Sequence, residues 1–347
     1  MKLSITGREA HTLAISLIAA RSFMTLTIDG TAYRNSGWVC MLGGYLLALP
    51  LAAAIDMRRR DFLSAAGFVW KAICAVFASV MAYEAAVISR ILVNSVSYSN
   101  LETISPLTMT LVMLLIAMYA VIKNGRGLGN AAKLWIIAFV VIFAVIIIMN
   151  LRYMRPRWLL PVLGPGADKL IDGSISAAGN ISCGALLHLF AVDTELRGRR
   201  SCVRSVTIGC AAGLALCLYW GMMVPVQIDG RMDRLSRLET LLSNGRTDLG
   251  VQLPVTFLWF MAYIVSLAGY CYIAAVCCQA IAPSVNGKYI AAFTALAAFI
   301  IANAGLAESS GAEFVAGWEY PAFAALLALA GIAALIKRKA GGNEKIA

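Results

Sequence analysis

Two oppositely charged residues lie inside apolar stretches, where charge is costly. Arg21 lies within AHTLAISLIAARSFMTLT, and Glu84 lies within the long apolar run 63–93. A charged side chain in a membrane-spanning helix usually marks a ligand site or a buried pair. Three arrangements of Arg21 stay open on this reasoning: an ion pair with Glu84, a direct contact with a ligand carboxylate, or extension of the long side chain to the outer membrane surface.

A second group of polar residues lies in the run SISAAGNISCGALLHLF of the apolar segment 171–193. Glycine weakens a helix, and a broken helix exposes backbone amides that attract a carboxylate. Close packing of helices through small residues is the alternative explanation. The predicted substrate-binding site combines this group with the two charges and one neighbouring hydroxyl: Arg21, Ser22, Glu84, Gly179, Asn180, Ser182 and Gly184.

The sequence shows no pattern that is typical of an enzyme or a metal protein. It has no G-x-S-x-G, no H-E-x-x-H and no P-loop, and the glycines of GRGLGN lack the preceding strand of a dinucleotide site. Its nine cysteines lack paired metal-ligand spacing, and His188 is interpreted as a packing residue rather than a proton relay. We therefore predict no catalytic activity, no metal and no cofactor.

The composition indicates that these residues sit in a membrane. Of the 347 residues, 61% are hydrophobic and 14% are charged, whereas an ordinary soluble domain is about 45–50% apolar and about 25% charged. The mean hydropathy is +0.79. An integral membrane protein in contact with a lipid bilayer is therefore predicted. The net charge of +11 follows from basic loops, so no nucleic-acid partner is expected.

Hydropathy predicts ten membrane-spanning helices. Their approximate bounds are 7–27, 36–56, 63–93, 106–122, 131–150, 171–193, 203–224, 252–281, 287–305 and 320–336. Most Lys and Arg residues of the connecting segments fall on the side of the N-terminus, which predicts that both termini are cytoplasmic. Two long outer connections, 151–170 and 225–251, are expected to be amphipathic segments on the outer face.

The span count suggests a particular all-α architecture in one membrane domain, 1–347. Ten spans with both ends inside fit two inverted five-helix halves, 7–150 and 171–336. In such transporter-like folds, the first helix of each half is broken near the middle of the bilayer and binds the substrate there. We therefore predict breaks in the spans 7–27 and 171–193.

Several stretches of the sequence resemble one family. They are RPRWLLPVLGPGADKLIDGSISAAGN, the opening SITGREAHTL, Ser36-Gly37-Trp38, and RLSRLETLLSNGRTDLGVQLPVTFLWFMAYIV. In their order along the chain they are similar to the B subunits of bacterial spore germinant receptors, which form a spore-germination branch of the amino acid–polyamine–organocation superfamily. Three features depart from the family pattern: Ala185 follows Gly184 where an acidic residue is common, the run 190–193 lacks the usual proline, and the first span lacks the usual helix breaker.

The resemblance implies a multi-pass protein of the bacterial cell membrane or the spore inner membrane. Family members are thought to bind a small germinant, often an L-amino acid, in a transporter-like pocket. They relay binding to a larger A subunit and a lipoprotein C subunit, which triggers germination. Two other functions stay open: a proton- or sodium-coupled secondary transporter of amino acids or amines, and a structural membrane subunit with a vestigial pocket.

Overall fold

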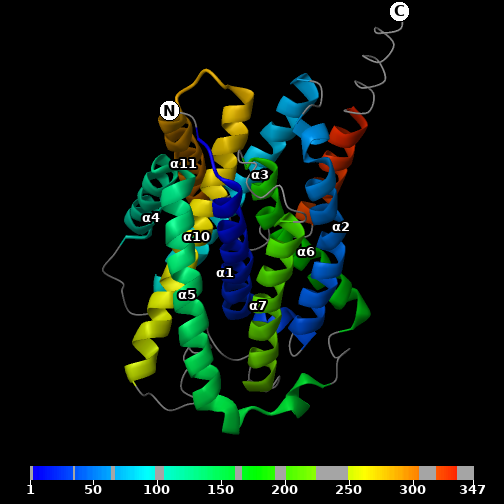
Figure 1. Cartoon of the computed structure of the whole chain (residues 1–347). Coiled ribbons are helices and arrows are strands. Elements are labelled where there is room, and N and C mark those ends of the chain that lie inside the picture. The colour runs from blue at the N-terminus through cyan, green and yellow to red at the C-terminus, as the bar shows by residue number, and fades with distance from the viewer. Residues whose placement is uncertain are drawn as a thin grey trace, which may run out of the picture.

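The fold is a helical bundle, seen in a computed structural model of the chain (Figure 1). The structure describes residues 3–33, 36–63, 67–97, 105–160, 166–191, 201–223, 249–304 and 318–333. Within these residues the elements are helices, apart from one isolated parallel β-bridge between Ile5 and Ala191. The bridge joins the segment before the first helix to the residues that follow the sixth.

Each of the ten segments predicted to span the membrane coincides with a helix in the described part of the chain. The helices are α1 (Gly7–Tyr33), α2 (Gly37–Leu63), α3 (Gly67–Ser97), α4 (Pro106–Ile122), α5 (Asn124–Asn150), α6 (Ala167–Leu189), α7 (Ser201–Met223), α10 (Leu249–Ile281), α11 (Gly287–Asn303) and an unlabelled helix, Trp318–Ala333. Two short 3-10 helices, η2 (Leu151–Tyr153) and η3 (Pro156–Leu159), follow α5.

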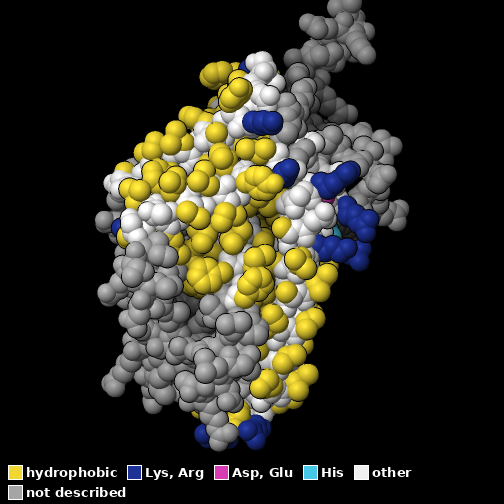
Figure 2. All heavy atoms as spheres, turned by 90° about the vertical axis from the view of Figure 1, so that its left-hand side faces the viewer, with side chains coloured by type: hydrophobic (Ala, Val, Ile, Leu, Met, Phe, Trp, Pro, Cys, Tyr) yellow, Lys and Arg dark blue, Asp and Glu magenta, His cyan; other side chains and the backbone are white. Residues whose placement is uncertain are grey.

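The helices have the length and surface of a membrane protein. Six of them, within the described residues, are long and apolar enough to cross a bilayer, and three shorter apolar helices accompany them. Figure 2 shows a broad hydrophobic face where α4, α5 and α11 lie, with Lys and Arg side chains at its lower end, near its top and along its right-hand margin. Exposed side chains such as Leu115, Val141 and Phe293 belong to this face. Their exposure is the expected state of residues in contact with lipid.

Helix α1 lies in the interior of the bundle. It packs against α5, α6, α7 and α10, and the α1 residues Leu13, Leu17 and Ile18 are almost completely buried. Around it, α2 packs against α6 and α7, and α3 packs against α10. A residue on α1, such as Arg21, is therefore surrounded by protein on several sides.

Connections that are predicted to lie on the same side of the membrane lie at the same end of the bundle. Figure 1 shows the start of the chain and the α10–α11 connection at one end, and η2 and η3 at the other. The backbone of Leu3 donates to the Gln279 side chain near the end of α10, at 2.7 Å. A Cβ added to Gly125, at the start of α5, would lie 2.8 Å from the carbonyl oxygen of Ser4.

The predicted helix breaks are wrong. Helix α1 runs without interruption from Gly7 to Tyr33, and α6 runs without interruption from Ala167 to Leu189. The glycines of α6 serve close packing instead: a Cβ added to Gly184 would lie 2.8 Å from Ile18 Cγ1, and one added to Gly179 would lie 2.9 Å from Glu319 Cβ. A neighbour fills the space beside each glycine, so the helix keeps its backbone hydrogen bonds.

Some predictions fall outside the described residues. They concern most of the outer segment 225–251, residues 161–165 of the segment 151–170, and the basic stretch after residue 333. The described part of the first outer segment contains η2 and η3, and η3 includes Trp158.

Candidate functional site

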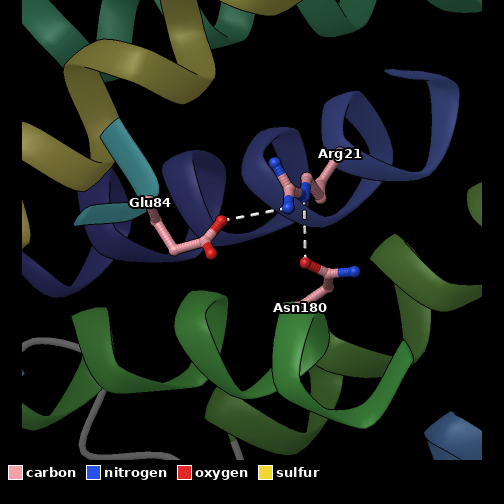
Figure 3. A network of polar contacts seen from close by, with 3 residues as sticks. All are labelled: Arg21, Glu84 and Asn180. Carbon is pink, nitrogen blue, oxygen red and sulfur yellow. Dashed lines mark hydrogen bonds and ion pairs between the residues drawn. The ribbon is translucent and has the colours of Figure 1, made fainter. Parts of the chain in front are cut away.

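The centre of the bundle holds a polar cluster built from three helices (Figure 3). Arg21 on α1 points between Glu84 on α3 and Asn180 on α6. Its Nη2 lies 3.0 Å from Glu84 Oε2, and its Nε donates to Asn180 Oδ1 at 3.0 Å. The Glu84 side chain is 1% exposed and that of Arg21 is 12% exposed. Of the arrangements that the sequence left open for Arg21, the structure shows the ion pair with Glu84.

Close helix packing places Arg21 against α6. Ile18 lies one turn before Arg21 on α1, and it contacts the glycine surfaces of two neighbouring helices. A Cβ added to Gly184 on α6 or to Gly209 on α7 would lie 2.8 or 2.9 Å from the Ile18 side chain. These glycines let α1 approach both helices, which brings the guanidinium of Arg21 within reach of Asn180.

A second carboxylate completes the cluster, and the sequence analysis missed it. Glu319, at the start of the helix Trp318–Ala333, is 3% exposed. It lies within hydrogen-bonding range of Glu84 and close enough to Arg21 for a Coulombic interaction. A Cβ added to Gly179, the neighbour of Asn180, would lie 2.9 Å from Glu319 Oε2. Its Oε1 has no hydrogen-bond partner in the described part of the chain.

The position of Glu319 explains why it was missed. Glu319 falls in the connection between the predicted spans 287–305 and 320–336, one residue before the second of them. The available signal was an acidic residue directly beside an apolar segment. How deep the helix Trp318–Ala333 begins in the bundle depends on contacts that the residues after Glu319 make with other helices. Tyr320 donates to the Leu47 carbonyl at 2.8 Å, and Phe323 packs edge-to-face on Phe77.

The structure brings together only part of the predicted site. Arg21, Glu84 and Asn180 are in contact, and Gly179 adjoins them through Glu319. The other three predicted residues have packing roles. The Ser22 hydroxyl donates to the Ile18 carbonyl at 2.8 Å, the Ser182 hydroxyl donates to the Ala178 carbonyl at 2.7 Å, and Gly184 contacts Ile18. Because α6 is unbroken, its amides are not exposed for a carboxylate.

The electrostatics of the cluster favour binding of positive charge or of a zwitterion. One guanidinium faces two carboxylates in an environment of low polarity, where Coulombic interactions are stronger than in water. Cys183 on α6 and Tyr270 on α10 also lie close enough to interact with Arg21. Among the described residues, no group of three or more His, Cys, Asp or Glu side chains is arranged to hold a metal ion.

A second polar network joins both histidines of the chain. The Ser205 hydroxyl lies 2.6 Å from His11 Nδ1, 2.8 Å from His188 Nε2 and 2.8 Å from the Ser201 carbonyl oxygen. A hydroxyl has a single proton, so Ser205 donates to one of these three groups, and the tautomers of His11 and His188 set the remaining roles. The contact of His188 with Ser205 thus ties α6 to α7.

Comparison with known proteins supports a membrane role. Residues 67–226, just under half of the chain, match a family model described as spore germination protein. The resemblance to the spore germination protein family is confirmed. The matched range contains Glu84 and Asn180 of the cluster, whereas Arg21 and Glu319 lie outside it. The search of curated proteins gives no match.

Solved structures show the same fold in a transporter. Three crystal structures of mutants of the manganese transporter of Eremococcus coleocola superpose with TM-scores of 0.59, 0.56 and 0.56. Each is 14% identical in sequence, and each match covers 94% of this chain and 75% of the other. This similarity concerns the fold. Together with the spore germination match, it shows a multi-pass, transporter-like membrane protein, and neither comparison is with an enzyme.

Proposed function

We propose that the chain is a germinant-receptor membrane subunit that binds a small, amino-acid-like nutrient and triggers spore germination. The observation that carries the proposal is the buried cluster of Arg21, Glu84, Asn180 and Glu319 inside a transporter-like bundle. The spore germination match supports the receptor context, and the fold supports a central binding position. Buried ionisable residues in membrane helices are functional-site candidates by default.

The charges of the cluster complement those of an amino acid. An α-amino acid carries a carboxylate and an ammonium group. The guanidinium of Arg21 would receive the carboxylate, with Asn180 adding a hydrogen bond, and Glu84 and Glu319 would receive the ammonium group. Gly179 keeps the wall beside Glu319 free of a side chain, since any Cβ there would lie within 2.9 Å of the Glu319 carboxylate.

The proposed receptor has a defined arrangement in the membrane. It crosses the bilayer ten times in two inverted five-helix halves, with both termini in the cytoplasm, in the spore inner membrane or the cell membrane. Its protein partners would be the A and C subunits of the receptor. Native Cys202 is completely buried, so the sidedness must be tested with cysteines introduced at exposed positions.

A test of the site separates ligand binding from folding. Spores that carry the parent chain or its Arg21→Gln variant are exposed to the proteinogenic L-amino acids, and germination and membrane accumulation are both measured. Because Arg21 also pairs with Glu84, the variant should accumulate less than the parent; if Arg21 contacts the ligand, the protein that does accumulate should give no germination response. The matched control is Arg157→Gln, which alters an exposed arginine of η3. An Arg21→Gln variant that accumulates and germinates like the parent contradicts the proposal.

A proton- or sodium-coupled transporter of amino acids or amines is the second candidate function. The transporter fold and the pair of buried carboxylates favour it. Uptake of labelled amino acids by proteoliposomes that contain only this chain distinguishes the two functions. Sustained, ion-driven uptake supports the transporter, and binding without uptake supports the receptor subunit.

A further inference from the structure

We propose that Glu84 and Glu319 share one proton and form a proton-binding site at the centre of the bundle, with Arg21 as its counter-ion. The two residues come from α3 and from the helix Trp318–Ala333, far apart in the sequence. The proposal deepens the proposed function, since it names the ion to which ligand binding at this cluster is linked.

The geometry leaves room for a proton between the two carboxyl groups. Glu84 and Glu319 lie within hydrogen-bonding range of one another, yet an ionised carboxylate has only acceptors. Glu319 Oε1 is buried and has no hydrogen-bond donor among the described residues, whereas Glu84 Oε2 lies 3.0 Å from Arg21 Nη2. One proton on either group supplies the missing donor and turns a repulsive contact into a hydrogen bond.

The charges around the pair lead to the same conclusion. The described groups that face it are Arg21 on α1, the Cys183 thiol on α6 and the Tyr270 hydroxyl on α10. Tyr83, which precedes Glu84 on α3, also interacts with Glu84. On α2, the carbonyl oxygen of Leu47 already accepts a hydrogen bond from the Tyr320 hydroxyl. The one cation among these groups is Arg21. A single bound proton therefore makes the cluster neutral, whereas two ionised carboxylates would leave one buried negative charge without a partner.

A shared proton links the cluster to ligand chemistry. An ammonium group that enters between Glu84 and Glu319 would compete with the proton for the same oxygens. The bound proton would then be released when the ligand binds, and ligand affinity would rise with pH. This step rests on the proposed function, whereas the proton site itself does not.

Infrared spectroscopy of the purified full-length chain in detergent tests the proton site without any ligand or partner subunit. A protonated carboxyl group has a C=O stretching band that is separate from the carboxylate bands and moves on exchange into D₂O. At about pH 7 an exposed glutamate, with a pKa near 4.3, is ionised and gives no such band. We expect the parent protein to show this band. Glu84→Gln and Glu319→Gln should each lose it completely, because the remaining carboxylate ionises beside Arg21. Asp172→Asn, which alters an exposed carboxylate on α6, should retain it.

Each outcome decides the proposal. A band that survives in both glutamine variants places the proton elsewhere and overturns it. A parent protein without the band overturns it as well, and a rise in melting temperature in NaCl relative to choline chloride would then assign the pair to a sodium ion. If one variant does not fold, the other still tests the loss of the band. A failed germination assay together with an intact band would refute the receptor function and leave the proton site standing.

Discussion

Replacing Arg21 with glutamine removes the cation that two buried carboxylates share. Glu84 is 1% exposed and Glu319 is 3% exposed, so water does not replace the lost partner. Removing one member of a buried ion pair costs about 3–5 kcal/mol. That cost corresponds to a decrease of about a hundred-fold to a few thousand-fold in the ratio of folded to unfolded protein. The melting temperature should fall by on the order of 10 °C.

The same geometry predicts an asymmetry between the two members of the pair. In a Glu84→Gln variant, Arg21 keeps Glu319 as a partner and keeps its bond to Asn180. The loss is then about 1.5–3 kcal/mol, the value for a hydrogen bond to a charged group. The double variant Arg21→Gln with Glu84→Gln leaves one carboxyl group, which can be neutral when protonated. It should recover much of the stability that Arg21→Gln loses.

The assay combines two readouts of the folded protein. Fluorescence from a C-terminal reporter measures accumulation in the membrane, and thermal unfolding in detergent measures stability. Arg21→Gln should rank lowest, the double variant should lie between it and Glu84→Gln, and Glu84→Gln should be nearest to the parent. An Arg21→Gln protein as stable as the parent, or a double variant as poor as Arg21→Gln, would refute the argument from buried charge.

Three further predictions concern packing, capping and sidedness. Gly44→Ala should destabilise the protein by about 1–3 kcal/mol, because the added Cβ would lie 2.5 Å from Ala177 Cβ. Thermal unfolding measures this loss of stability. The control is Gly67→Ala, which has open space around the added Cβ and should not lower the melting temperature. Asp56→Ala should lower the free energy of unfolding by about 0.5–2 kcal/mol in the same assay, because Asp56 accepts two hydrogen bonds of 3.0 Å from first-turn amides of α7. An unchanged melting temperature would show that this helix cap does not stabilise the protein. The variants Arg157→Cys and Ser284→Cys each place a cysteine at an exposed position. In intact cells, an impermeant maleimide should label Arg157→Cys and should not label Ser284→Cys. Labelling of Ser284→Cys would contradict the proposed orientation.

The positions of the helices were predictable because hydropathy is a local property. A chain in hydrocarbon must satisfy its backbone groups within each segment, so a long apolar run becomes a helix wherever it occurs. The predicted segment 106–122 coincides with α4 (Pro106–Ile122), and 287–305 differs from α11 (Gly287–Asn303) by two residues. The charges of Arg21 and Glu84 were also recognisable, since apolar stretches flank each of them on both sides.

The helix breaks were not predictable, because the effect of a glycine depends on what lies beside it. The sequence shows Gly179 and Gly184 around Asn180 and Ser182, and this pattern is compatible with an unwound segment or with close packing. Ile18 and Glu319 occupy the space next to the two glycines. Contacts from other helices therefore decide that α6 is continuous, and those contacts are absent from any local pattern.

By itself, the sequence determined that the protein is a helical membrane protein, where its helices lie, and that Arg21 and Glu84 need partners. These properties follow from the cost of placing polar backbone and charge in hydrocarbon, which each segment meets on its own. The tertiary structure alone decided that Arg21 pairs with Glu84 and Asn180, and that Glu319 joins them. The physical reason is depth: a side chain enters the cluster only if packing sets its helix at the right height, and that height depends on residues hundreds of positions away.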